Sequence, residues 1–206
     1  MVRVISKTAF ALTLGAVTML GACKKSDNAT DTTMAATDTS IKAGAMSGTS
    51  MNAPATAAPV TDAGIFAALA AANQGEIDAG KMAEAKATTA AVKSFAHDMV
   101  IAHTAMLNSG NALAKKLNIT PDPAAADSID AMSRSTGAAL SAAPKGAGFD
   151  SAYVNAQVVG HQYVLDMIKR DESVAQNTEL KSALTSAEPK VQAHLDRIRT
   201  IQGKLK

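Results

Sequence analysis

Three of the four histidines occupy positions where an apolar helical stripe would bury them. His103, His161 and His194 each take one place in a series of apolar residues spaced three and four apart, and each series lies in a different segment of the chain. Glu76 takes the equivalent place in a fourth segment. Neutral imidazole nitrogens, together with a carboxylate, are ligands for zinc, iron or copper. The spacing therefore predicts four helices that each point one ionisable side chain into a common core, where a transition metal could bind.

The heights of these side chains can be compared along their helices. At ~1.5 Å per residue, each histidine lies ~24 to ~25 Å from the turn of its own helix pair, whereas Glu76 comes out at ~16 Å, one to two turns away. We therefore expect the three histidines to meet, with Glu76 as a further candidate ligand. In the alternative interpretation they are core groups that hydrogen-bond to one another or to Asn73, Gln157 and Asp150. His97 falls beside its stripe and is expected at the rim.

Several other chemistries are disfavoured. No histidine has a glutamate three residues before it, so the di-iron carboxylate signature is absent. No glycine-rich phosphate loop follows a strand pattern, and no serine lies in a nucleophile elbow. Aromatic residues make up only 3% of the chain, and no basic stripe is present. We therefore expect no nucleic-acid partner, and the sequence leans against an enzyme.

The segments that must position the histidines have a helical pattern. A shorter helix is expected within residues 123–143, where it would be part of a link of roughly 30 residues. Such a link is long enough to run the length of a bundle, so the pattern predicts an all-α, ferritin-like four-helix bundle with a short extra helix in the crossover. Asp62 is the expected N-cap of the first helix, and Pro189 is expected to kink the last. The four long helices are predicted over 62–86, 89–117, 149–175 and 178–205.

The N-terminal residues have the pattern of an export signal. Arg3 and Lys7 precede an apolar run of 13 residues, 8–20, which is too short to span a bilayer comfortably. The sequence Leu20-Gly21-Ala22-Cys23 follows, and it resembles a bacterial lipoprotein signal with its lipobox. The resemblance implies that residues 1–22 are removed and that Cys23, the only cysteine, is acylated, for example by palmitate, and anchors the protein to a membrane.

The residue after the cysteine and the charge balance refine this prediction. Lipoproteins with aspartate after the cysteine tend to stay at the inner membrane, whereas here Lys24 follows, which implies the outer membrane, facing the periplasm. The net charge of +2 comes entirely from residues 1–22, so the mature chain gives no charge argument for an acidic partner. Residues 23–61 are rich in alanine, threonine and serine, without any period, and are expected to form a disordered tether to a domain over 62–206.

The positions of several motifs also match a family. The sequence resembles a family of uncharacterised bacterial exported proteins, a domain of unknown function that is grouped with ferritin-like bundles and often labelled as outer-membrane proteins. The resemblance implies a ferritin-like fold and an envelope location, but no reaction. Asp150, Tyr153, Gln157 and Pro189 are expected to support the site. The residues that carry the resemblance are Glu76 with Gly80, Phe95-Ala96-x-x-Met99 with His103, Phe149-Asp150-x-x-Tyr153, Gln157, His161, Pro189 and His194-Leu195.

Two functions follow as hypotheses. The first is an envelope lipoprotein that binds a metal ion or a small ligand through its core histidines. The second is a non-catalytic structural or stress-related interaction module whose histidines are only structural. The sequence leaves open whether the protein is a homo-oligomer.

Overall fold

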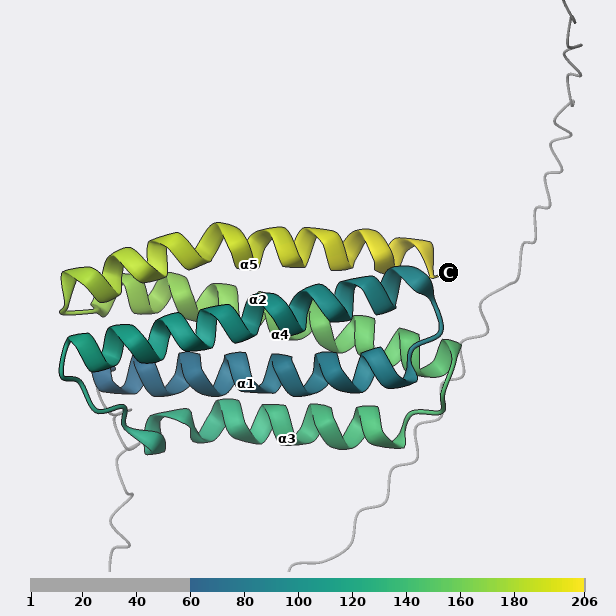
Figure 1. Ribbon diagram of the computed structural model, residues 1–206, viewed down its shortest axis with the longest axis horizontal. Coiled ribbons are helices and arrows are strands. Elements are labelled where there is room, and N and C mark those ends of the chain that lie inside the picture. Colours follow the sequence, from purple (N-terminus) through teal and green to yellow (C-terminus); the bar gives the residue numbers. More distant parts are fainter. Residues whose placement is uncertain (1–59, 206) are drawn as a thin grey trace, which may run out of the picture. The chain divides into compact units, whose positions relative to one another are not determined.

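The computed structural model describes residues 60–205, which are almost entirely helical and contain no strand (Figure 1). The long helices are those that the apolar stripes predict, with ends that differ by two residues at most. The predicted shorter helix is a 3-10 turn that continues directly into an α-helix. The elements are α1 (Asp62–Lys86), α2 (Ala90–Lys116), η1 (Pro123–Ala126), α3 (Asp127–Ala142), α4 (Ala147–Val174) and α5 (Thr178–Lys204).

The helix ends follow from local chemistry. The N-cap of α1 is Thr61, whose hydroxyl accepts a hydrogen bond from the Gly64 amide at 3.1 Å, and not Asp62 as predicted. Thr61 has the extended backbone of an N-cap, whereas Asp62 is already helical and its carboxylate accepts hydrogen bonds from the amides of Gln176 and Asn177. Asn118 ends α2 in the left-handed region, at φ 55°, a conformation that asparagine tolerates better than most residues. Gly146, at φ 103°, precedes α4 in a conformation that favours glycine.

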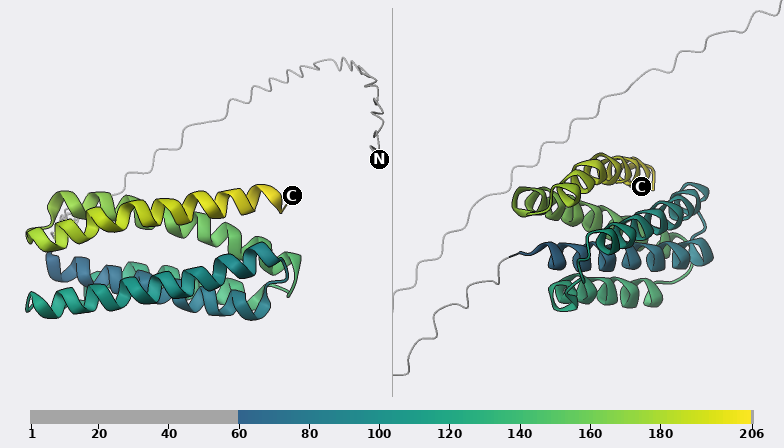
Figure 2. Two further views of the ribbon diagram at one scale, coloured as in Figure 1. Left: turned by 45° about the horizontal axis from the view of Figure 1, so that its top comes forward. Right: turned by 60° about the vertical axis from the view of Figure 1, so that its left-hand side comes forward.

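The helices form two antiparallel hairpins, α1–α2 and α4–α5, joined by α3 (Figure 1). Because the crossover through η1 and α3 runs the length of the bundle, the α1–α2 turn and the α4–α5 turn lie at opposite ends. Lys86, the last residue of α1, donates from its ammonium group to three carbonyl oxygens at the end of α3, those of Leu140, Ser141 and Ala143. The right-hand view of Figure 2 shows α3 on the side of α1 that faces away from α5.

Each hairpin turn is held by a carboxylate from the other hairpin. Asp150, in the first turn of α4, accepts hydrogen bonds from the backbone amides of Thr88 and Thr89 at 3.0 and 2.8 Å. Asp62, at the start of α1, accepts from the amides of Gln176 and Asn177, both at 2.8 Å. These carboxylates satisfy turn amides that would otherwise lack partners, and they fix the two hairpins against each other at both ends.

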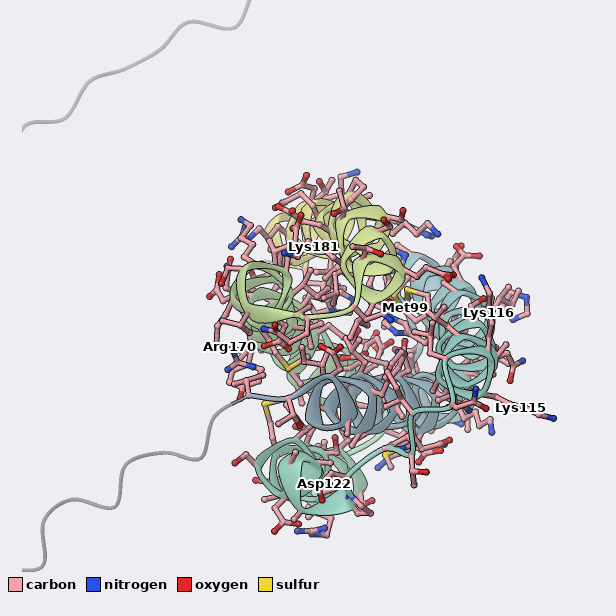
Figure 3. The ribbon with its side chains drawn as sticks, turned by 90° about the vertical axis from the view of Figure 1, so that its left-hand side faces the viewer. Met99, Lys115, Lys116, Asp122, Arg170 and Lys181 are labelled. Atoms are coloured by element: carbon pink, nitrogen blue, oxygen red, sulfur yellow. The ribbon has the colours of Figure 1, made fainter. Side chains whose placement is uncertain are left out.

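One large apolar core runs between the two hairpins, and it includes Phe95, Phe149, Tyr153 and Leu195. Met99 belongs to the same core and lies inside the bundle in the view along the helices, whereas Lys115 and Lys116 project outward from the end of α2 (Figure 3). A smaller cluster, Ala68, Ala72, Ile129 and Met167, packs α3 against α1 and α4. Because α1 has neighbours on several sides, alanine is buried around much of its circumference.

The predicted signal at 1–22, the acylated Cys23 and nearly all of the predicted tether at 23–61 lie outside the described residues. Within residues 60–205, no helix is both long and apolar enough to cross a membrane.

Candidate metal centre

The structure brings His103, His161 and His194 together from three helices: α2, α4 and α5. Each offers one ring nitrogen, and these three nitrogens all lie within 4.8 Å of one another. The ring centroids form a nearly equilateral triangle with sides of 5.6, 5.5 and 5.6 Å. We refer to these three residues as the histidine triad. It lies near the middle of all three helices, which is where the stripes predict it.

The partners of the triad determine which ring nitrogens are free. Nδ1 of His103 lies 2.9 Å from Oδ1 of Asn73, and Nδ1 of His161 lies 3.0 Å from the backbone oxygen of Gln157. Both oxygens can only accept, so both Nδ1 atoms carry the proton and both Nε2 atoms carry a lone pair. Each Nε2 is buried without a hydrogen-bond partner, and so is Nδ1 of His194. The triad therefore contains three buried, unpaired ring nitrogens.

The surroundings keep His103 and His194 neutral. Burial lowers the pKa of His103 to about 2, with a further contribution from repulsion by His161 and His194. Burial also lowers the pKa of His194 to about 4, helped by His161 and Arg197 and opposed by Asp98. A metal ion binds the neutral imidazole through its lone pair, and this is the form that such a site maintains.

Glu76 lies beside the triad but is not one of its members. Its Oε1 is 3.9 Å from Nδ1 of His161, on the ring nitrogen that Gln157 already occupies, and its Oε2 accepts from Nε2 of Gln157 at 2.7 Å. Glu76 is nearer the histidines than the height comparison predicts, because the two hairpin turns from which those heights are measured lie at opposite ends. Measured from the end of the bundle that holds the α1–α2 turn, Glu76 lies at ~16 Å and His161 at ~20 Å.

The other predicted residues have separate roles. Asp150 is not a partner of the triad, since its carboxylate holds the α1–α2 turn. Tyr153 is fully buried, its ring stacks on Phe149 with centroids 6.3 Å apart, and its hydroxyl has no partner. Helix α5 continues through Pro189 without a break. His97 lies on the surface, where Nδ1 is 2.7 Å from Oε1 of Glu84.

A cavity of about 450 Å³ adjoins the triad, a size within the usual range for small-molecule sites of about 300–1,000 Å³. Side chains from α1, α2, α4 and α5 line it, including all three histidines, Asn73 and Glu76. The sequence alone does not predict this cavity. Its only signal is the small size of Gly110 and Ala187, which occupy stripe positions where larger apolar residues would fill the space.

Comparison with known proteins gives a family but no reaction. No curated protein and no solved structure matches the chain. The model of one family, described as a domain of unknown function (DUF4142), matches residues 46–201, about three quarters of the chain. The match covers every helix except the last residues of α5. The protein is therefore a member of the DUF4142 family, whose function is not known.

Proposed function

We propose that this protein binds one transition-metal ion in the bundle core through His103, His161 and His194. The observation that carries the proposal is the set of three buried ring nitrogens, one per histidine, that have no hydrogen-bond partner. A buried polar atom without a partner costs on the order of 1–3 kcal/mol, and one ion would satisfy all three.

The surroundings of the triad support the same conclusion. A histidine that binds a metal through one ring nitrogen usually donates a hydrogen bond from the N–H of the other nitrogen to a carbonyl or carboxylate. This hydrogen bond orients the ring and fixes its tautomer. Asn73 and the Gln157 backbone oxygen do this for His103 and His161. Three nitrogen ligands with one open position are typical of zinc sites that bind a further ligand, and they also suit copper and iron. Tetrahedral zinc needs nitrogens ~3.4 Å apart, so small side-chain rotations would complete the site.

We propose further that the fold is a ferritin-like four-helix bundle and that the protein is an envelope lipoprotein. The order of the helices supports the first part, because two antiparallel hairpins are joined by a crossover that runs the length of the bundle. The lipobox-like sequence ending at Cys23 supports the second. Metabolic labelling with a fatty-acid analogue should mark the chain, and Cys23→Ser should abolish the label. A chain that carries no label when it is expressed in a bacterium would rule out acylation.

Metal analysis tests the main proposal. The full chain, purified without a histidine tag from cells grown with iron, zinc, copper and manganese, should carry equimolar metal by mass spectrometry. His161→Asn should remove it. His97→Asn is the matched control, since His97 is the surface histidine, and it should leave the metal content unchanged. Substoichiometric metal in the unaltered chain, with no thermal shift when these ions are added, would show that the histidines are structural.

A further inference from the structure

The cavity beside the histidine triad is apolar along its length. Its walls include Phe66, Leu69, Met106, Ile168, Leu184 and Val191. These side chains come from all four long helices. From the triad, the lining extends along α5 as far as Leu180, ~21 Å away at 1.5 Å per residue, toward the end of the bundle that holds the α4–α5 turn. An elongated, mostly apolar molecule fits such a space.

The two ends of the cavity differ in chemistry. The inner end holds the unpaired nitrogens of the triad. The mouth lies between α2 and α5, where the exposed lining residues include the polar side chains of Ser109, Asn111, Ser186 and Lys190. Lys190 is the one charged residue among them, so the entrance carries a positive charge. A ligand with an apolar body and an anionic group would meet a favourable charge at the mouth and an ion at the inner end.

The charge of the metal site indicates what kind of head group its ligand carries. Three neutral imidazoles bring no negative charge to a divalent ion. Glu76 is the carboxylate beside the triad, but it is held by Gln157 on the Nδ1 side of His161, away from the free Nε2. An anionic donor from outside the chain would therefore occupy the open coordination position.

We infer that the cavity binds an amphipathic monocarboxylate, with its carboxylate on the open position of the metal and its apolar chain along the cavity. This inference rests on the proposed metal site. It assigns a ligand class to that site: small organic acids with one apolar tail. Gly110 lies on the cavity wall, and a Cβ built there meets no other atom within 4 Å. A large side chain at this position would fill the cavity without touching the histidines.

Titration calorimetry with sodium decanoate tests the inference on the zinc-loaded full chain. Decanoate should bind, and removal of zinc should weaken binding at least tenfold. Decanol, which has the same tail without the carboxylate, should bind no better than decanoate binds to the metal-free chain. Gly110→Phe should weaken decanoate binding at least tenfold while zinc content stays equimolar. Gly203→Phe is the matched control, because Gly203 also has open space around it but lies outside the cavity lining.

The outcomes separate the two proposals. A chain that holds zinc but does not bind decanoate overturns the ligand assignment and leaves the metal site standing. Equal binding of decanol and decanoate, or binding unaffected by Gly110→Phe, also overturns it. A chain that holds no metal overturns the metal site and this inference together.

Discussion

Oδ1 of Asn73 on α1 lies 2.9 Å from Nδ1 of His103 on α2, and Nδ2 of the same side chain donates to the backbone oxygen of Leu69 at 2.7 Å. The amide is thus anchored to its own helix while it orients a ring on the neighbouring one. Through this contact α1 takes part in the histidine triad, although it supplies no histidine.

Replacing Asn73 should therefore weaken metal binding without removing a ligand. Asn73→Leu leaves Nδ1 of His103 without its acceptor, and the loss of such a partner typically lowers metal affinity about 10–100-fold. Asn73→Asp keeps an acceptor for Nδ1 of His103 but loses the hydrogen bond to Leu69, so it should retain more affinity than Asn73→Leu. A competition titration with a zinc chelator would measure both. Asn155→Leu, at an exposed position on α4 away from the triad, is the control. An unchanged affinity in Asn73→Leu would contradict the orienting role.

The histidines should make the metal-free protein sensitive to acid. The pKa values of His103 and His194 are lowered to about 2 and about 4 by burial, and both return to 6.5 on unfolding. Below pH 6.5, His103 and His194 therefore bind protons in the unfolded chain but stay unprotonated in the folded chain. Each histidine then lowers the free energy of unfolding by about 1.4 kcal/mol per pH unit. The loss from His194 levels off near pH 4 and that from His103 near pH 2.

Denaturant unfolding at pH 7, 6 and 5 measures this slope. The slope should fall in His103→Asn, because one of the two proton-linked groups is gone, and should stay the same in His97→Asn. Comparing slopes rather than absolute stabilities removes the general cost of each substitution. Equal slopes for His103→Asn and the unaltered chain would mean that His103 is protonated in the folded state.

Asp150→Asn should destabilise the bundle. Burial raises the pKa of Asp150, but hydrogen bonds from the amides and hydroxyls of Thr88 and Thr89 outweigh burial and hold that pKa below its usual value. The carboxylate therefore stays charged, and its stabilisation is lost as pH falls through the lowered pKa. The side-chain amide of the variant replaces one acceptor oxygen with an NH2 group, a donor that would face the donor groups of Thr88 and Thr89. We expect a loss of about 2–3 kcal/mol. Asp166→Asn, an exposed change on the same helix, should cost less than about 0.5 kcal/mol.

Gly80 and Gly110 offer a matched pair of glycine-to-alanine substitutions within helices. A Cβ at Gly80 would lie 2.7 Å from Cγ2 of Val100 and 3.1 Å from the backbone oxygen of Ala96, so Gly80→Ala should push α1 and α2 apart and cost about 1–3 kcal/mol. A Cβ at Gly110 meets nothing, so Gly110→Ala should gain about 0.5–1 kcal/mol from helix propensity. Thermal unfolding would measure both. A Gly80→Ala variant as stable as the unaltered chain would show that the contact between α1 and α2 adapts at little cost.

Much of this structure could be predicted from the sequence because its signals are local. Asn118 and Gly146 mark helix ends through their backbone conformations, and the three-four stripes point His103, His161 and His194 into one core at similar heights. The docking of α3 on α1 could not be predicted. Alanines are buried around much of α1, so no stripe identifies its second packing face.

The environment of Glu76 and the presence of the cavity also could not be predicted from the sequence. The position of Glu76 depends on the two hairpin turns being at opposite ends, which periodicity within single helices does not determine. The cavity depends on how four separate stripes fit together. A glycine at position 110 leaves space only if no neighbouring side chain fills it, and that is a property of the whole packing arrangement.

Asp62 and Asp150 make the two hairpins depend on each other at both ends of the bundle. Separating them would strip the carboxylate partner from four backbone amides, those of Thr88, Thr89, Gln176 and Asn177. If either end of the bundle frays, it therefore loses charge-assisted hydrogen bonds even when the other end stays intact. We therefore expect the hairpins to open as a single cooperative unit, so amides in the middle of α1, α2, α4 and α5 should exchange their hydrogens at a common rate set by global unfolding.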